Sequence, residues 1–182
     1  MAYILPLLET SRLVLKPWTV ADIDALHRLW TDADVRRYLW DDVVVSRDRA
    51  EQTVAQTIDY AERSGIGMWC IYRRESPNLI GFCGFRFIED SQDVEILYGL
   101  TPAVWKQGLA LEACIAAINY GFAAILFEQV FGRTDVPNVA SVRLLERLGM
   151  EFKGQTMIGD LPTLVYCLQQ SAPRALPSRI PA

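Results

Sequence analysis

The stretch Glu95-Ile-Leu-Tyr-Gly-Leu-Thr-Pro-Ala-Val-Trp-Lys-Gln-Gly-Leu-Ala-Leu-Glu-Ala113 decides the fold. Its pattern predicts a strand that ends near Leu100, a short loop over residues 101–107 and a long helix that begins at Gly108. The first N–H groups of a helix lack intrahelical partners and lie at the positive end of its dipole, so such a helix start binds anions. Gly108 and the small Ala110 would let a pyrophosphate approach the backbone closely. From the residues alone, a phosphate site and an ordinary turn glycine both remain open interpretations.

Outward from this stretch, the sequence alternates between segments typical of strands and segments with helical periodicity. The predicted strands are Arg12–Lys16, Met68–Arg73, Leu79–Ile88, Val94–Leu100, Gln129–Thr134, Met150–Met157 and Thr163–Leu168. The predicted helices begin near Thr19 and Ser46, cover about Gly108–Leu126 and cover Asn138–Leu148. This order predicts an α+β (mixed α/β) domain with a mixed central sheet of about seven strands and helices on both faces. The strands on either side of the long helix should be parallel.

Length and composition narrow the class of protein. The 182 residues fit one domain, expected over residues 9–170, with a flexible tail over residues 171–182. The net charge of −4 argues against a broad nucleic-acid surface, so no nucleic-acid partner is expected. The longest apolar stretch, Ala113–Phe127, is shorter than the roughly 20 residues of a membrane span, and the start lacks a secretory pattern. A cytoplasmic protein that does not enter a membrane is therefore expected.

Cysteine spacing gives no sign of a metal site. Cys70, Cys83, Cys114 and Cys167 lie far apart and form no Cys-x-x-Cys or Cys/His pattern. We expect buried, reduced thiols and no metal. The sequence also lacks the glycine-rich loop of nucleotide-binding proteins and the Gly-x-Ser-x-Gly turn of hydrolases.

The segment Trp105-Lys-Gln-Gly-Leu-Ala110 resembles the acyl-CoA pyrophosphate loop of the GCN5-related N-acetyltransferase (GNAT) superfamily, Gln/Arg-x-x-Gly-x-Gly/Ala. Thr10–Pro17, Leu79–Gly84 and Val94–Leu100 resemble the first, third and fourth strands of that fold, and Asn138–Met150 resembles its second motif. The tryptophan that opens the loop, Glu-Ala after the helix start and Asn-x-x-Ser before Leu-Gly are most similar to the RimJ/RimL-type branch of ribosomal-protein N-terminal acetyltransferases. The similarity covers roughly residues 9 to 170.

The resemblance implies a binding site for acetyl-CoA between splayed fourth and fifth strands, whose unpaired backbone takes up the pantetheine arm. The implied donor-binding residues are Tyr98, Gly99, Leu100, Trp105, Lys106, Gln107, Gly108, Leu109, Ala110, Asn138, Ser141 and Arg143. Lys106 stands where this branch often has glycine. For Lys106 and Arg143, a CoA phosphate contact and a solvated surface charge are alternative roles.

The family transfers the acetyl group directly to an amine, which assigns possible roles to two catalytic candidates. Glu95 resembles a glutamate that acts as a base or positions water, a role that a pKa raised by burial would suit; alternatively, strand alternation turns it to solvent. The thiolate-protonating tyrosine of many relatives would fall at Leu145. Ser141 matches a serine near the CoA sulfur; alternatively, it only satisfies backbone groups at a helix start. A backbone N–H near Leu100 is the expected oxyanion donor.

The first two helices and the loop between them are implied to shape the acceptor cleft. Tyr38 and Trp40 are the candidate acceptor-binding residues, while Asp41 and Asp42 either attract a cationic amine or are solvated turn residues. His27 is expected to be structural. The first hypothesis is therefore an acetyl-CoA-dependent N-acetyltransferase for a protein N-terminus or a small amine, monomeric or homodimeric. The alternative is a non-catalytic acyl-CoA-binding or regulatory domain.

Overall fold

The computed structural model describes residues 3–170, in which eight strands form one mixed sheet in the order β1-β2-β3-β4-β5-β6-β8-β7. The strands are Leu8–Glu9 (β1), Leu13–Pro17 (β2), Met68–Arg73 (β3), Leu79–Phe87 (β4), Val94–Leu100 (β5), Gln129–Asp135 (β6), Glu151–Ile158 (β7) and Leu161–Gln169 (β8). Neighbouring strands are antiparallel except β5 and β6, which are parallel as predicted. The tail predicted over residues 171–182 lies outside the described residues.

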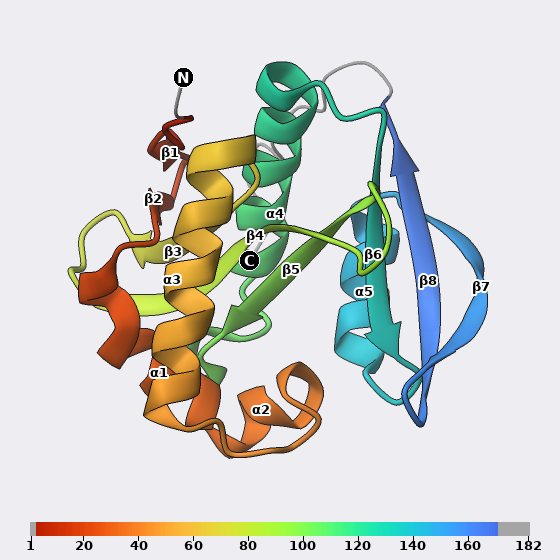
Figure 1. Cartoon of the computed structure of the whole chain (residues 1–182), viewed down its shortest axis with the longest axis horizontal. Coiled ribbons are helices and arrows are strands. Elements are labelled where there is room, and N and C mark those ends of the chain that lie inside the picture. Colours follow the sequence, from red (N-terminus) through yellow and green to blue (C-terminus); the bar gives the residue numbers. More distant parts are fainter. Residues whose placement is uncertain (1–2, 171–182) are drawn as a thin grey trace.

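Helices cover both faces of the sheet, as predicted (Figure 1). One layer contains α1 (Ile23–Thr31), α2 (Ala33–Leu39) and α3 (Arg47–Ser64); the other contains α4 (Leu109–Tyr120) and α5 (Val139–Arg147). Each layer has its own hydrophobic cluster. Trp30, Met68 and Phe82 belong to the cluster under α1–α3, and Ile96, Cys114 and Leu145 belong to the cluster under α4 and α5.

Local sequence signals explain the best-predicted element, α3. Ser46 is its N-cap, and the Ser46 hydroxyl accepts a hydrogen bond from the Arg49 N–H at 3.2 Å. Gly65 ends the helix with φ of 75°, a left-handed conformation that glycine adopts without steric cost. The predicted start of this helix near Ser46 is confirmed.

Three elements differ from the prediction. The sheet has an eighth strand, the two-residue β1, which is too short to leave a sequence pattern. Helix α2 has seven residues where a loop was expected; the Asp32 side chain caps it by accepting from the N–H groups of Asp34 and Val35. The long helix ends at Tyr120 and continues as a π-helical turn, Gly121–Ile125, in which Gly121 leaves room for the Phe127 ring.

The strands β5 and β6 diverge, as the resemblance implied for the fourth and fifth of the seven predicted strands. β5 pairs with β4 over its whole length, but among the described residues its register with β6 has the single pair Glu95↔Phe131. Figure 1 shows the two strands separating toward their carboxyl ends. The edge of β5 that faces β6 and the edge of β6 that faces β5 are therefore left without a strand partner over most of their length.

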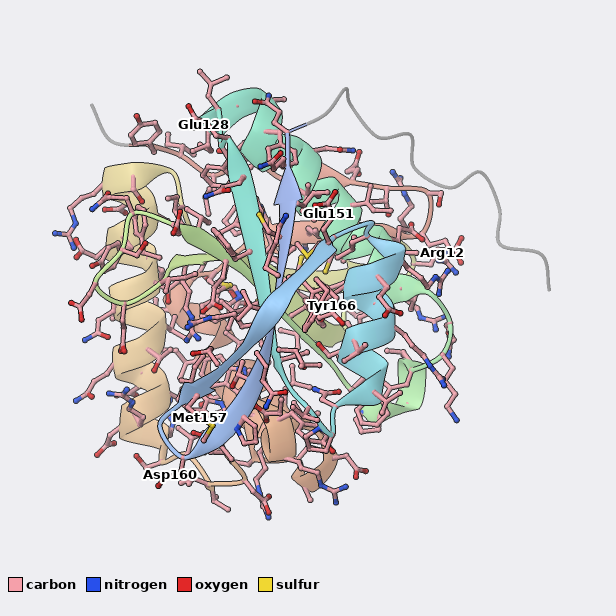
Figure 2. The ribbon with its side chains drawn as sticks, turned by 90° about the vertical axis from the view of Figure 1, so that its right-hand side faces the viewer. Arg12, Glu128, Glu151, Met157, Asp160 and Tyr166 are labelled. Carbon is pink, nitrogen blue, oxygen red and sulfur yellow. The ribbon has the colours of Figure 1, made fainter. Side chains whose placement is uncertain are left out.

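A hairpin of β7 and β8 closes the far end of the sheet (Figure 2). Its turn contains Asp160, and Met157 lies beside that turn. Phe152 and Met157 of the edge strand β7 are exposed.

Candidate active site

A cleft of about 1660 Å³ opens where β5 and β6 diverge and is lined by residues from both faces of the sheet. Of the predicted site residues, all except Gln107 line it. The Gln107 side chain instead accepts a hydrogen bond from Arg73 and donates to the Ala103 carbonyl, so it faces away from the cleft. One cavity thus joins the predicted donor and acceptor residues.

The loop before α4 lines the cleft and ends in the open start of that helix. Gly108 is the N-cap of α4 with φ of 73°, and the Glu112 N–H is the donor that bonds back to its carbonyl. Helix geometry therefore leaves the N–H groups of Leu109, Ala110 and Leu111 without intrahelical partners. The Trp105 indole donates to the Leu100 carbonyl at 2.7 Å and holds the loop against the end of β5.

Lys106 has a backbone conformation that favours glycine. Its φ is 60°, in the left-handed region that costs a residue with a side chain roughly 1 kcal/mol or more. The loop therefore holds Lys106 in this conformation at an energetic cost, and Lys106 lines the cleft. Neither Lys106 nor Arg143 has an ion-pair partner among residues 3–170.

Buried Glu112 fixes the start of α4 to the turn between β1 and β2. Its carboxylate accepts hydrogen bonds from the Thr10 hydroxyl at 2.6 Å, the Arg12 N–H at 2.9 Å and the Arg12 Nε at 2.6 Å. Burial alone would raise the pKa of Glu112, but the hydrogen bonds from Thr10 and Arg12 outweigh it and hold the pKa below its ordinary value. Arg12 also donates to the Gln107 carbonyl at 3.0 Å, which ties the loop to the same turn.

Sequence reasoning used Glu112 only as part of a family motif and did not assign its function. The signal was available, because a glutamate in an otherwise apolar helix predicts a buried carboxylate with a specific partner.

The free edge of β5 presents backbone groups to the gap between the strands. The Thr101 N–H bonds to the Ile80 carbonyl at 2.9 Å, which fixes the phase of the β4–β5 ladder. Because hydrogen-bond direction alternates along a strand, the N–H and C=O of Tyr98 and the N–H of Leu100 point away from β4, toward β6. Gly99 has the opposite phase and bonds toward β4; its missing side chain makes room for the Phe82 ring.

Tyr98 and Ser141 meet across the donor half of the cleft. The Tyr98 Oη lies 2.6 Å from the Ser141 Oγ, and the Ser141 N–H donates to the Asn138 side chain at 3.2 Å. The Ser141 amide therefore has the structural role expected at a helix start, while the Ser141 hydroxyl bonds to Tyr98. Leu145, where relatives have a tyrosine, is 1% exposed and packs over Gly132 in the core.

Glu95 differs from one of the two sequence expectations. It is 3% exposed, so the solvent-facing interpretation is wrong. Arg133 donates to both carboxylate oxygens at 2.6 and 2.7 Å, and Arg86 donates to Oε1 at 2.6 Å. Burial would raise the pKa of Glu95, but these two guanidinium groups outweigh it and hold the pKa below its ordinary value, whereas a raised pKa would suit a base.

The two arginines are site residues that sequence reasoning missed. Arg86 lies directly opposite Glu95 in the β4–β5 register, so a correct strand pairing would have found it. Arg133 comes from β6, 38 residues further along the chain. No local pattern connects it to Glu95.

The residues predicted to bind the acceptor line the cleft at α2. Tyr38 is on α2 and Trp40 is its C-cap, and both line the cleft. Asp41 and Asp42 have different surroundings. Asp42 accepts a hydrogen bond from Arg36 at 2.9 Å. Burial, together with the nearby charge of Asp41, raises the pKa of Asp135 on the cleft wall. His27 Nε2 lies 2.9 Å from the Val45 carbonyl, which fits its expected structural role.

A tryptophan cluster forms the wall behind Trp40. The ring centroids of Trp18 and Trp40 each lie 5.5 Å from that of Trp30, and all three residues line the cleft. Their indole N–H groups are buried and have no hydrogen-bond partner among residues 3–170. The wall therefore combines apolar surface with three indole N–H groups that have no hydrogen-bond acceptor in the described part of the chain.

The four cysteines are free and buried, as expected. Among residues 3–170, no group of three or more His, Cys, Asp or Glu side chains is placed to hold a metal ion. Over the same residues, none of the helices has the length and apolar character needed to cross a membrane.

The fold and cleft define a class of protein, and a family model identifies it. Residues 12–151 match the acetyltransferase (GNAT) domain. The match covers more than half of the chain, so the chain belongs to the GNAT family and is an N-acetyltransferase. The resemblance inferred from the motifs is confirmed.

Two bacterial relatives are similar to this protein over most of its length. It is similar to the uncharacterised N-acetyltransferase YoaA of Bacillus subtilis, with 33% identity over 152 residues that cover 82% of this chain and 85% of YoaA. It is also similar to the uncharacterised N-acetyltransferase p20 of Bacillus licheniformis, with 28% identity over 148 residues covering 81% and 83% of the two chains.

Solved structures share the fold. An acetyltransferase from Agrobacterium tumefaciens has a TM-score of 0.81 at 20% identity, covering 93% of this chain and 98% of that one. RimL, a ribosomal L7/L12 α-N-protein acetyltransferase solved with coenzyme A, has a TM-score of 0.77 at 18% identity, covering 90% and 98%. A RimL-type structure is therefore among the chain's fold neighbours.

Proposed function

We propose that the chain transfers an acetyl group from acetyl-CoA directly to a primary amine, either a protein N-terminus or a small amine. The observation that carries this proposal is the free edge of β5 at Tyr98 and Leu100. It lies in one cleft with the open helix start at Gly108 on the donor side and with Tyr38 and Trp40 on the acceptor side. An extended pantetheine arm would bond to this edge as an added strand does.

In this proposal the donor is held mainly by backbone groups. The N–H groups after Gly108 receive the pyrophosphate at the positive end of the α4 dipole, and Lys106 and Arg143 add positive charge beside the phosphates. Asn138 caps α5 beside the pantetheine arm. The site thus recognises the features common to acyl-CoA molecules, whatever the acyl group.

The transfer makes three changes at the reacting atoms, and the cleft must support each of them. The amine nitrogen forms a bond to the thioester carbon, the carbonyl oxygen gains negative charge, and the C–S bond then breaks with its electron pair leaving on sulfur. We assign the Leu100 N–H to the oxyanion, because it points into the gap between β5 and β6. Ser141 is assigned to the sulfur.

Glu95 takes the water-positioning role, the second of the two that the resemblance offers. Its carboxylate is ionised and both oxygens accept hydrogen bonds from guanidinium groups, which makes it a weak base. It holds Arg86 and Arg133 at the acceptor wall, and the proton released by the amine passes to water. Tyr38 and Trp40 contact the acceptor.

The test is release of CoA from acetyl-CoA by the purified protein, followed with a thiol reagent. The acceptors are tetrapeptides with a free N-terminus, spermidine, L-lysine and tyramine, each paired with its N-acetylated form. We expect at least one free amine to raise CoA release above the acceptor-free rate while its blocked form does not. Binding of acetyl-CoA without amine-dependent release by any of them would contradict the proposal.

The name of the CoA-bound structural neighbour supports the protein N-terminus as one candidate acceptor, since RimL is named for that activity. The cytoplasmic location and the monomeric or homodimeric state stay predictions from the sequence.

A further inference from the structure

The Tyr98–Ser141 contact joins two elements that are 43 residues apart in sequence. Tyr98 lies on the face of β5 that packs toward α4 and α5, and Ser141 lies in the first turn of α5. Their oxygens are 2.6 Å apart, a short O–H···O hydrogen bond. Both residues line the cleft.

The surrounding bonds limit what the Ser141 hydroxyl does. Its own N–H is already bonded to Asn138, so α5 is capped without help from Oγ. A serine hydroxyl has one donor hydrogen and two acceptor positions. After bonding to Tyr98, Ser141 Oγ still has capacity for a second partner.

The chemistry of the two hydroxyls sets the direction of the bond. A phenol is a stronger hydrogen-bond donor than an aliphatic alcohol, and burial raises the pKa of Tyr98, so the ring keeps its proton. Tyr98 therefore donates and Ser141 Oγ accepts. The serine hydrogen is then left to point toward another acceptor in the cleft.

We infer that Tyr98 is a positioning residue that holds the Ser141 O–H directed at the sulfur of CoA. The inference rests on the proposed acetyl-CoA site. As the C–S bond breaks, the electron pair moves to sulfur and the Ser141 O–H donates a hydrogen bond to the new thiolate. No proton needs to leave either hydroxyl: the proton lost by the amine enters solvent, and the thiolate takes one from solvent later. The pair occupies the donor half of the cleft, where Leu145 provides no hydroxyl.

The measurable consequence is the pKa of the CoA thiol when CoA is bound. A hydrogen bond to the thiolate favours the charged form, so the bound thiol should ionise below the ordinary thiol value of about 8.5. Cys114 on α4, whose pKa burial raises, is the titratable thiol that acts on Tyr98, and Lys106 and Arg143 line the same cleft. All three are present in each variant used, so they cancel in the comparison.

The experiment titrates the ultraviolet absorbance of the thiolate in complexes with CoA, after subtracting the titration of the protein without CoA. We expect Ser141→Ala to lower the thiolate-to-thiol ratio of bound CoA about tenfold at fixed pH, and Tyr98→Phe about threefold. The double variant should match Ser141→Ala, because Tyr98 acts through Ser141. Ser141→Thr, which keeps the hydroxyl, should retain most of the effect.

The matched control is Tyr120→Phe, a half-buried tyrosine on α4 that does not line the cleft and should leave the thiol unchanged. Calorimetric titration with CoA accompanies every variant. An unchanged thiol pKa in Tyr98→Phe with intact CoA binding overturns the inference, and so does an unchanged value in Ser141→Ala if Tyr98→Phe does not fold. Absence of CoA binding by the unmodified protein overturns the proposed function itself and the inference with it.

Discussion

The two halves of the cleft are built differently. The half on the α4–α5 side, which we propose binds the donor, is formed by backbone groups: the free edge of β5 at Tyr98 and Leu100 and the open start of α4 at Gly108. The half on the α1–α3 side, which we propose binds the acceptor, is formed by side chains from distant elements, with Glu95 held between Arg86 and Arg133. A backbone site recognises a constant ligand such as CoA, whereas a side-chain site is free to vary with the acceptor.

The largest effect is expected for Gly108→Glu in the donor half. The substitution puts a carboxylate beside the pyrophosphate and a side chain on a residue with φ of 73°. We expect the affinity for acetyl-CoA to fall roughly 100-fold or more, because like charges repel strongly at a partly enclosed site. Calorimetric titration measures it.

The control for this change is Gly159→Glu, which has a similar backbone conformation, with φ of 57°; nothing lies within 4 Å of the position that its Cβ would take, and Gly159 does not line the cleft. It carries the same charge and a similar strain but should bind acetyl-CoA normally. Equal affinities for the two variants would remove Gly108 from the donor site.

Glu95→Gln tests the acceptor half. It leaves two guanidinium groups beside a neutral amide, and breaking a buried ion pair of this kind costs about 2 to 4 kcal/mol of unfolding free energy. Urea denaturation measures the loss. The affinity for acetyl-CoA should stay within about twofold, an effect below 0.5 kcal/mol, because Glu95 lies on the acceptor side. A large loss of CoA affinity without loss of stability would break the division of the cleft into two halves.

The same variant makes a pH prediction with a definite sign. Because the folded protein holds the pKa of Glu95 below its ordinary 4.5, the ion pair stabilises fully above that pH and its contribution disappears as pH falls through the folded value. The stability difference between the unmodified protein and Glu95→Gln should therefore shrink in acid. Glu151→Gln, at an exposed pair with Lys153, is the control and should change stability little.

Glu112→Gln provides the corresponding change in the donor half. It removes the charge that holds Arg12 and the loop before α4, and we expect a loss of about 1 to 3 kcal/mol in unfolding free energy. Unlike Glu95→Gln, it should also weaken acetyl-CoA binding about three- to tenfold through the displaced loop. A loss of CoA affinity in Glu112→Gln but not in Glu95→Gln would sharpen the comparison; the same effect from both would contradict it.

The smallest effect is expected for Lys106→Gly. Glycine adopts φ of 60° without a Cβ penalty, so the variant should be more stable by up to about 1 kcal/mol while losing the charge beside the phosphates. Thermal unfolding measures the gain in stability, and the dependence of CoA affinity on salt measures the loss of the charge. A destabilised variant would show that the lysine side chain holds the loop.

The donor half could largely be predicted because its signals are local. The strand, loop and helix over residues 94–120 follow from periodicity and from Gly108, and the divergence of β5 from β6 was implied by the family resemblance. The side-chain contacts in this half were harder to predict, because Gln107 bonds to Arg73, a partner 34 residues earlier in the chain.

The acceptor half could not be predicted to the same depth. The state of Glu95 depends on the β4–β5 register and on Arg133, which lies 38 residues further along the chain. Helix α2 was missed because seven residues give too few turns for a periodic pattern. Such features arise only when the chain folds.

The most direct test of the central claim is calorimetric titration of the purified protein with acetyl-CoA, with ATP and NAD as controls. The claim is that the diverging strands and the start of α4 form an acyl-CoA site. We predict saturable binding of one acetyl-CoA per chain and no binding of NAD or ATP at the same concentrations. No binding of acetyl-CoA, or equal binding of all three, would contradict it.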